Sequence, residues 1–167
     1  MIRTKRTSPE QPQRALLLAC GNTYRGDDGV SWRIGRAVEQ QLELAGLSVV
    51  MTRQLLPEHA EAISTADIVV FVDCSALTEA GTVSTVPIQP AQSLPRLLTH
   101  HLDPGSLLRL AVDLYARTPS RAVVVTVGGN CFELTDHLSK PVKAAVPKAM
   151  EAVRCALLGM DAIPHAC

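Results

Sequence analysis

The sequence predicts an α/β protein, a three-layer sandwich in which a twisted, mostly parallel sheet of about five strands carries helices on both faces. Near-continuous apolar runs at 15–20, 67–73 and 121–127 are typical of strands that are buried on both faces. Segments with helical spacing of apolar residues separate these runs along the chain. The 167 residues are 47% hydrophobic and 19% charged, which suits one domain with a substantial core.

The first half of the chain alternates strands and helices. A turn rich in glycine and asparagine at 21–29 follows the first strand. We expect a helix at 28–45, ended by Gly46, because apolar side chains recur every four residues, at Val30, Ile34, Val38 and Leu42. Residues 47–54 have strand composition, and 57–64 are expected to form a short helix with its proline near the start.

The second half continues the pattern with one exception. The apolar strand 67–73 is followed, without an intervening helix, by a second strand at 82–88, which we expect to be an antiparallel edge strand. A loop at 100–104 precedes a helix at 105–116. The strand 121–127 then ends at two glycines, and a last amphipathic helix spans 141–158.

Composition excludes several classes of protein. Sixteen Lys and Arg balance sixteen Asp and Glu, and aromatic residues are only 3%, which argues against a nucleic-acid binder. No apolar run is long enough to span a bilayer, and the one that follows the basic N-terminal residues is shorter than the core of a signal peptide. The five cysteines form no CxxC pair, so neither a structural zinc site nor a disulfide framework is indicated, and a reducing cytoplasm fits.

We expect a flexible polar leader at 1–13, a single α/β domain at 14–160 and a short tail at 161–167.

Two acidic residues stand in the first turn, where an open α/β sheet places its sites. This turn lacks the GxGxxG of dinucleotide-binding proteins, and Asp27 and Asp28 occupy the positions where a P-loop has Lys and Ser. Two carboxylates at a helix start repel phosphate and attract a cation. Either could instead cap the helix, since Asp is a favoured N-cap residue.

Further candidate ligands follow other strands of the predicted sheet. Asp73 closes a buried strand, and His100 and His101 lie in a loop that could fold over the same edge. Asp28, Asp73 and one of these histidines would supply two oxygen ligands and one imidazole, a set that suits a divalent transition ion such as nickel or zinc. Alternatively, Asp73 accepts hydrogen bonds from loop amides, and the two histidines are solvated surface residues.

Other catalytic signatures are absent from the sequence. There is no HExxH and no GxSxG, and no cysteine has a motif-like neighbourhood. Cys20, Cys74 and Cys131 each follow or end a predicted strand, where buried structural cysteines are commoner than nucleophiles. We interpret His59 as a surface or packing residue, and Asp136 with His137 as a solvated pair.

The order of these motifs resembles the hydrogenase maturation proteases. Gly21-Asn22 followed by Asp27-Asp28-Gly29-Val30 looks like the opening signature of that family, and Val72-Asp73-Cys74 resembles its second motif. Thr99-His100-His101-Leu102 resembles its histidine loop, and Gly128-Gly129 with 132–142 matches its closing segment. The resemblance runs from about Leu16 to about Leu158.

The resemblance implies an endopeptidase that removes the C-terminal extension of a [NiFe]-hydrogenase large-subunit precursor after nickel insertion. Its metal-contacting residues would be Asp28, Asp73 and His101, with Asp28 or Asp73 as the general base. Gly21, Asn22, Asp27 and His100 would support them, and the doubled histidine leaves His100 possible as the ligand. Nickel would come with the precursor and could serve as a recognition handle or polarise the scissile carbonyl.

Other functions remain open at the level of the sequence. A non-cleaving, nickel-dependent hydrogenase assembly chaperone or metal-binding protein would use the same residues for binding alone. A small-molecule amidohydrolase on a similar sheet is a further alternative. For the favoured interpretation we expect a cytoplasmic monomer whose partner is the precursor, with neither nucleic acid nor membrane as a partner.

Overall fold

A computed structural model describes residues 13–94 and 102–160. Their five strands form one sheet in the order β2-β1-β3-β5-β4. Pairing is parallel throughout except between β4 and β5, so the edge strand is antiparallel as predicted. The strands are β1 (Ala15–Cys20), β2 (Leu47–Thr52), β3 (Ile68–Ser75), β4 (Val83–Pro87) and β5 (Arg121–Gly128).

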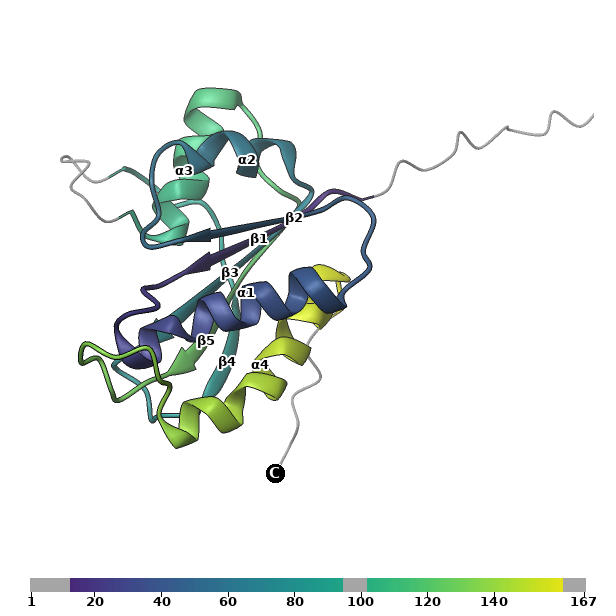
Figure 1. Cartoon of the computed structure of the whole chain (residues 1–167). Coiled ribbons are helices and arrows are strands. Elements are labelled where there is room, and N and C mark those ends of the chain that lie inside the picture. Colours follow the sequence, from purple (N-terminus) through teal and green to yellow (C-terminus); the bar gives the residue numbers. More distant parts are fainter. Residues whose placement is uncertain (1–12, 95–101, 161–167) are drawn as a thin grey trace, which may run out of the picture.

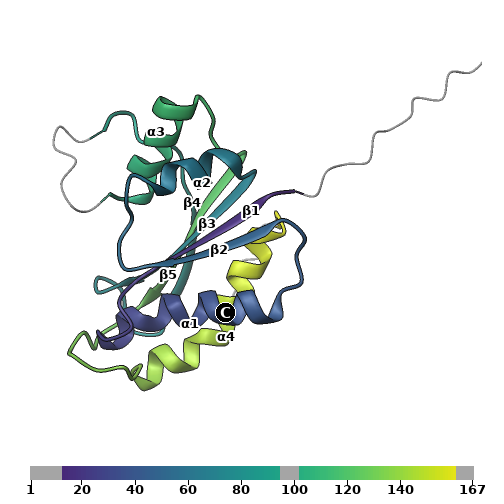
Figure 2. The same ribbon diagram turned by 45° about the horizontal axis from the view of Figure 1, so that its top comes forward.

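Helices cover both faces of this sheet, which confirms the predicted three-layer α/β architecture. Figure 1 shows α1 and α4 on one face and α2 and α3 on the other, and the rotated view of Figure 2 keeps the same two layers apart. A short 3-10 helix, η1, precedes α1. The bounds are η1 (Gly26–Gly29), α1 (Val30–Gln41), α2 (His59–Thr65), α3 (Pro104–Tyr115) and α4 (Lys140–Leu157).

The central strands are buried on both faces because each face packs against its own helical layer. Alternate side chains of a strand point to opposite sides of the sheet. Leu17, Val70 and Val125 therefore pack with α1 and α4, whereas Leu18 and Phe71 pack with α2 and α3. The alternation explains why the sequence shows continuous apolar runs rather than a polar face.

The start of α3 lies close to the candidate site and is fixed by local chemistry. The Asp103 carboxylate accepts hydrogen bonds from the backbone N–H of Ser106 at 2.8 Å and from its hydroxyl at 2.9 Å. Pro104 occupies the first helical position, where no N–H is needed. This N-cap sets where the chain enters α3, directly after the undescribed residues 95–101.

The expected helix at 28–45 was wrong at both ends. Its first residues form η1, and α1 begins only at Val30. The chain leaves the helix at Leu42, whose φ of −100° and ψ of 102° are extended, so Gly46 does not stop it. Gly46 has a φ of +82° and instead forms the turn that leads into β2. No helix among the described residues is long and apolar enough to cross a membrane.

Candidate functional site

Asp28 lies in η1, just beyond the carboxyl end of β1. Its Oδ2 accepts a hydrogen bond from the backbone N–H of Asn22 at 2.9 Å. The Asn22 side chain in turn accepts from the N–H of Tyr24 at 3.0 Å, so the loop is closed on itself. Gly21 is required here, because a Cβ atom at this position would collide with the Asp28 carbonyl oxygen. The half-buried Asp28 carboxylate makes no helix cap, so the capping interpretation was wrong.

Asp73 lies on β3, at the same edge of the sheet. The strand continues to Ser75, two residues beyond the predicted end. Asp73 is an exposed residue, but the protein around its carboxyl group removes water, and this desolvation raises the pKa of Asp73. A hydrogen bond from the N–H of Cys74 partly opposes the rise, and the negative charge of Asp28 adds to it. The structure therefore brings Asp28 and Asp73 within electrostatic reach of each other.

Asp27, the neighbour of Asp28, is fully buried and has a different set of contacts. Its carboxylate accepts hydrogen bonds from the backbone N–H groups of Asn130, Cys131 and Ser139 at 3.0, 2.9 and 2.7 Å. The hydroxyl of Ser139 donates a fourth at 2.9 Å. Burial alone would raise the pKa of Asp27, but these hydrogen bonds outweigh it and lower the pKa.

Further backbone contacts join η1 to the segment that connects β5 to α4. The N–H of Gly26 donates to the carbonyl of Thr135 at 2.8 Å, and the N–H of Asp27 donates to the carbonyl of Cys131 at 2.7 Å. We call the four bonds to the Asp27 carboxylate the Asp27 clamp. The clamp holds η1, and with it Asp28, against the segment that connects β5 to α4. Sequence reasoning missed it, because its partners lie more than a hundred residues away.

A cavity of about 240 Å³ opens beside Asp73. Its apolar lining comes from Leu55, Phe71 and Leu102, and Arg53 adds a positive charge. Leu102 is the first described residue after 95–101. His100 and His101, the candidate ligand histidines, lie outside the described residues. Within residues 13–94 and 102–160, no group of three His, Cys, Asp or Glu side chains could hold a metal ion.

Two cysteines lie near the acidic pair, and their environment makes them poor nucleophiles. Burial, reinforced by the negative charges of Asp73 and Asp28, raises the pKa of Cys20 to about 11. Burial and the charges of Asp28, Asp27 and Asp73 raise the pKa of Cys74 to about 12. Both thiols therefore stay protonated at neutral pH, which agrees with the structural role expected for them.

The remaining described histidines have partners other than the acidic pair. The Nδ1 atom of His59 accepts a hydrogen bond from the N–H of Leu56 at 2.9 Å, at the start of α2. The Nδ1 atom of His137 lies 3.4 Å from Asp136, and both side chains are largely exposed, as predicted. Neither histidine forms a hydrogen bond or ion pair with Asp28 or Asp73 in the part of the chain that the structure describes.

Several solved structures are similar to this one over most of its length. No family model and no curated protein sequence matches the chain. The hydrogenase maturating endopeptidase HybD from E. coli is 22% identical, with a TM-score of 0.71 over 88% of this chain and 93% of that chain. The [NiFe] hydrogenase maturation protease HybD from Thermococcus kodakarensis is 24% identical, with a TM-score of 0.62 over 86% of this chain and 99% of that chain.

A further protease from Thermococcus kodakarensis has a similar structure. The [NiFe] hydrogenase maturation protease HycI from Thermococcus kodakarensis KOD1 is 19% identical, with a TM-score of 0.66 over 89% of this chain and 95% of that chain. The chain therefore has the fold of the hydrogenase maturation proteases, as the order of its motifs predicts.

Proposed function

We propose that this protein is an endopeptidase that removes the C-terminal extension of a [NiFe]-hydrogenase large-subunit precursor after nickel insertion. One observation carries the proposal. On a fold shared with hydrogenase maturation proteases, two carboxylates from different elements, Asp28 and Asp73, meet at the carboxyl edge of the parallel sheet. This edge is where open α/β sheets place their sites.

The acidic pair suits contact with a metal ion that the substrate already holds. Two carboxylates are an incomplete ligand set. Desolvation raises the pKa of Asp73 and the negative charge of Asp28 adds to the rise, and a cation at this site would offset both effects. Nickel prefers nitrogen and sulfur ligands as well as oxygen. We therefore treat nickel as part of the precursor, with Asp28, Asp73 and His101 as its contacts from this chain.

The chemistry asked of this chain is hydrolysis of one peptide bond. A carboxylate of the pair accepts a proton from water, and the resulting hydroxide attacks the scissile carbonyl carbon. The C–N bond then breaks, and the proton passes to the leaving amine. The high pKa values of Cys20 and Cys74 support water rather than a thiol as the nucleophile.

The proposal is tested by intact-mass spectrometry of a nickel-loaded large-subunit precursor incubated with this protein. We expect a discrete loss of a C-terminal peptide, and no loss from nickel-free precursor. Asp28→Asn and Asp73→Asn should each slow processing by at least a hundredfold, since each removes a negative charge from the reacting centre. Asp113→Asn, at an exposed residue of α3, is the matched control and should process normally.

Two results would contradict the proposal. Normal processing by Asp28→Asn would remove the acidic pair from the reaction. Binding of the nickel-loaded precursor without any truncation by the wild-type protein would favour the non-cleaving assembly chaperone.

A further inference from the structure

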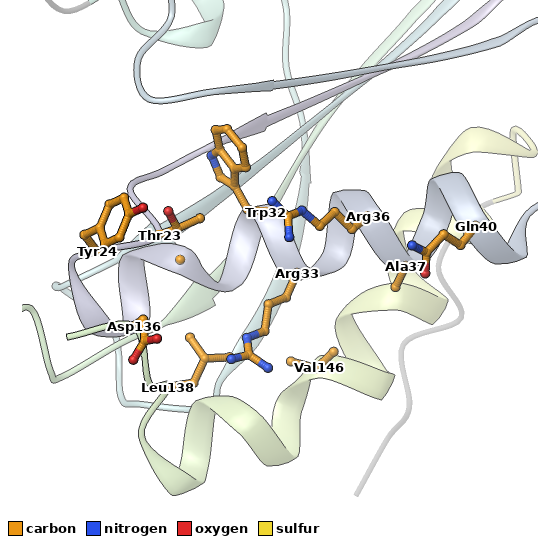
Figure 3. A pocket seen from close by; sticks show the side chains of 11 residues that line it. Thr23, Tyr24, Trp32, Arg33, Arg36, Ala37, Gln40, Asp136, Leu138 and Val146 are labelled. Carbon is orange, nitrogen blue, oxygen red and sulfur yellow. The ribbon is translucent and has the colours of Figure 1, made fainter.

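A groove of about 690 Å³ runs along α1, on the same side of the molecule as α4. Figure 3 shows its side chains, from Thr23 and Tyr24 at one end to Gln40 at the other. Leu138 and Val146 give it an apolar wall, and Arg33 and Arg36 give it positive charge. The groove is therefore both partly apolar and cationic.

The two guanidinium groups are presented by α1 without acidic partners. No carboxylate among the described residues forms an ion pair with Arg33 or Arg36. Figure 3 shows Arg33 reaching from α1 toward α4, with its guanidinium between Leu138 and Val146 in this view. The one acidic residue of the lining, Asp136, is exposed and faces His137.

Arg36 is held in place by an aromatic neighbour. Its guanidinium lies 5.9 Å from the centroid of the Trp32 ring. The indole N–H of Trp32 donates to the carbonyl of Thr52 at 3.1 Å, which fixes the ring against the end of β2. An anchored cation loses less side-chain entropy when it binds an anion than a free one does.

The groove is continuous with the loop that carries Asp28. Tyr24, at one end of the groove, donates its N–H to the Asn22 side chain, and the N–H of Asn22 donates to Asp28. A chain that crosses the acidic pair could therefore continue along α1. The 12 residues of α1 span about 18 Å at 1.5 Å per residue, which is the length of about five extended residues.

We propose that this groove binds an extended acidic segment of the large-subunit precursor, which carries apolar residues between its acidic ones. The acidic side chains pair with Arg33 and Arg36, and alternate apolar side chains pack on Leu138 and Val146. The inference rests on the proposed function, because that function supplies the precursor as the partner. Charge complementarity and continuity with the Asp28 loop select this occupant.

The test compares processing kinetics of the nickel-loaded precursor by the wild-type protein and by Arg33→Gln/Arg36→Gln. Because the groove lies outside the reacting centre, we expect KM to rise about tenfold while kcat stays within about twofold. Salt should raise KM for the wild type and raise it less for the variant. Arg117→Gln/Lys148→Gln removes the same charge from exposed residues outside the groove and should match the wild type.

A parallel binding measurement separates this inference from the proposed function. If the wild type cleaves and Arg33→Gln/Arg36→Gln has an unchanged KM, the groove inference is overturned while the function stands. If the wild type binds but never cleaves, the endopeptidase is overturned. In that case a tenfold loss of affinity in the variant supports the groove, and equal affinity overturns it. If the wild type does not bind the nickel-loaded precursor, both are overturned.

Discussion

Asp27 and Asp28 are adjacent in sequence, yet their carboxylates have separate environments. Asp27 is buried and receives four hydrogen bonds, whereas Asp28 is half-buried and receives one from Asn22. The pattern of two acids after a strand predicts a site but does not say which acid is structural. That assignment depends on Asn130, Cys131 and Ser139, whose proximity to Asp27 cannot be inferred from local sequence.

Replacement of Asp27 by Asn should destabilise the fold. The amide keeps one acceptor oxygen, but its NH2 group would face N–H donors that lose their acceptor. Hydrogen bonds to charged groups contribute about 1.5–3 kcal/mol each, so we expect the free energy of unfolding to fall by about 2–3 kcal/mol after relaxation. Urea denaturation measures this, with the exposed Asp136→Asn as a control that should change by less than about 0.5 kcal/mol. An unchanged urea midpoint for Asp27→Asn would contradict the clamp.

The Asp27 clamp also predicts how stability depends on pH. The pKa of Asp27 is lower in the folded protein than the ordinary value of 3.8. The ionised form is therefore favoured by folding, and the stabilisation is fully present above pH 3.8 and lost as the pH falls through the lower, folded value. In denaturation curves between pH 2 and 6, the free energy of unfolding of Asp27→Asn should fall less steeply with decreasing pH than that of the wild type. Both proteins should still lose some stability at low pH, because the pKa of Asp67 is also lowered, chiefly by its hydrogen bonds with Arg14.

Ionisation of Asp73 should have the opposite effect on the stability of the fold. Its pKa is raised in the folded protein, so its ionisation disfavours folding as the pH rises above 3.8. Asp73→Asn cannot ionise and keeps an oxygen for the N–H of Cys74. We expect a higher Tm than the wild type at pH 7 and an equal Tm near pH 3, measured by scanning calorimetry. A lower Tm at pH 7 would mean that Asp73 serves the fold rather than a function.

At the scale of the elements, the spacing of apolar residues correctly predicted α1, α3 and α4. It did not predict the residues at which α1 begins and ends. Four-residue spacing is satisfied by Leu42, yet its backbone is already extended. A pattern of apolar positions does not show where the last helical hydrogen bond is made. The pair Arg33 and Arg36 was missed for another reason: a net charge of zero conceals a local cationic face.

The helix α4 contains Pro147 in its interior, where it cannot donate a hydrogen bond to the carbonyl of Lys143. Pro147 is exposed, so its replacement should not disturb the core. Pro147→Ala should raise the free energy of unfolding by about 1–2 kcal/mol, because the helical gain exceeds the added entropy of the unfolded chain. Thermal unfolding checks this, and Lys148→Ala is a matched control with little expected change. A lower Tm for Pro147→Ala would show that the proline itself is needed for packing.

At the scale of the whole molecule, the three-layer architecture was predicted mainly from the apolar patterns of the strands. Continuous apolar runs required helices on both faces, and the absence of a helix before β4 predicted its antiparallel edge position. The meeting of Asp28 and Asp73 followed from the same topology, since parallel neighbours end at one edge. The contacts of His101 and His100 stay a prediction, because they lie outside the described residues.

The sheet order predicts which amides are most protected from hydrogen exchange. β1, β3 and β5 each have a hydrogen-bonded strand on both sides, whereas β2 and β4 lie at the edges. Opening an edge strand disrupts one ladder, and opening a central strand disrupts two. Exchange followed by NMR should therefore be slowest in β1 and β3, slow in β5, and fastest in β4, where Val86 is 52% exposed. Equal protection across the five strands would contradict this order.

During synthesis, β1, β2 and β3 leave the ribosome long before Ser139 does. Three strands can pair early, but the carboxylate of Asp27 has no partner until the segment after β5 arrives, 103 to 112 residues later. Contacts between residues so far apart in sequence form late, because closing a long loop costs chain entropy. The loop that carries Asp28 is therefore among the last parts of the domain to become rigid. In the nascent chain this loop is not yet fixed beside β3, so the candidate site is completed only when the domain is almost complete.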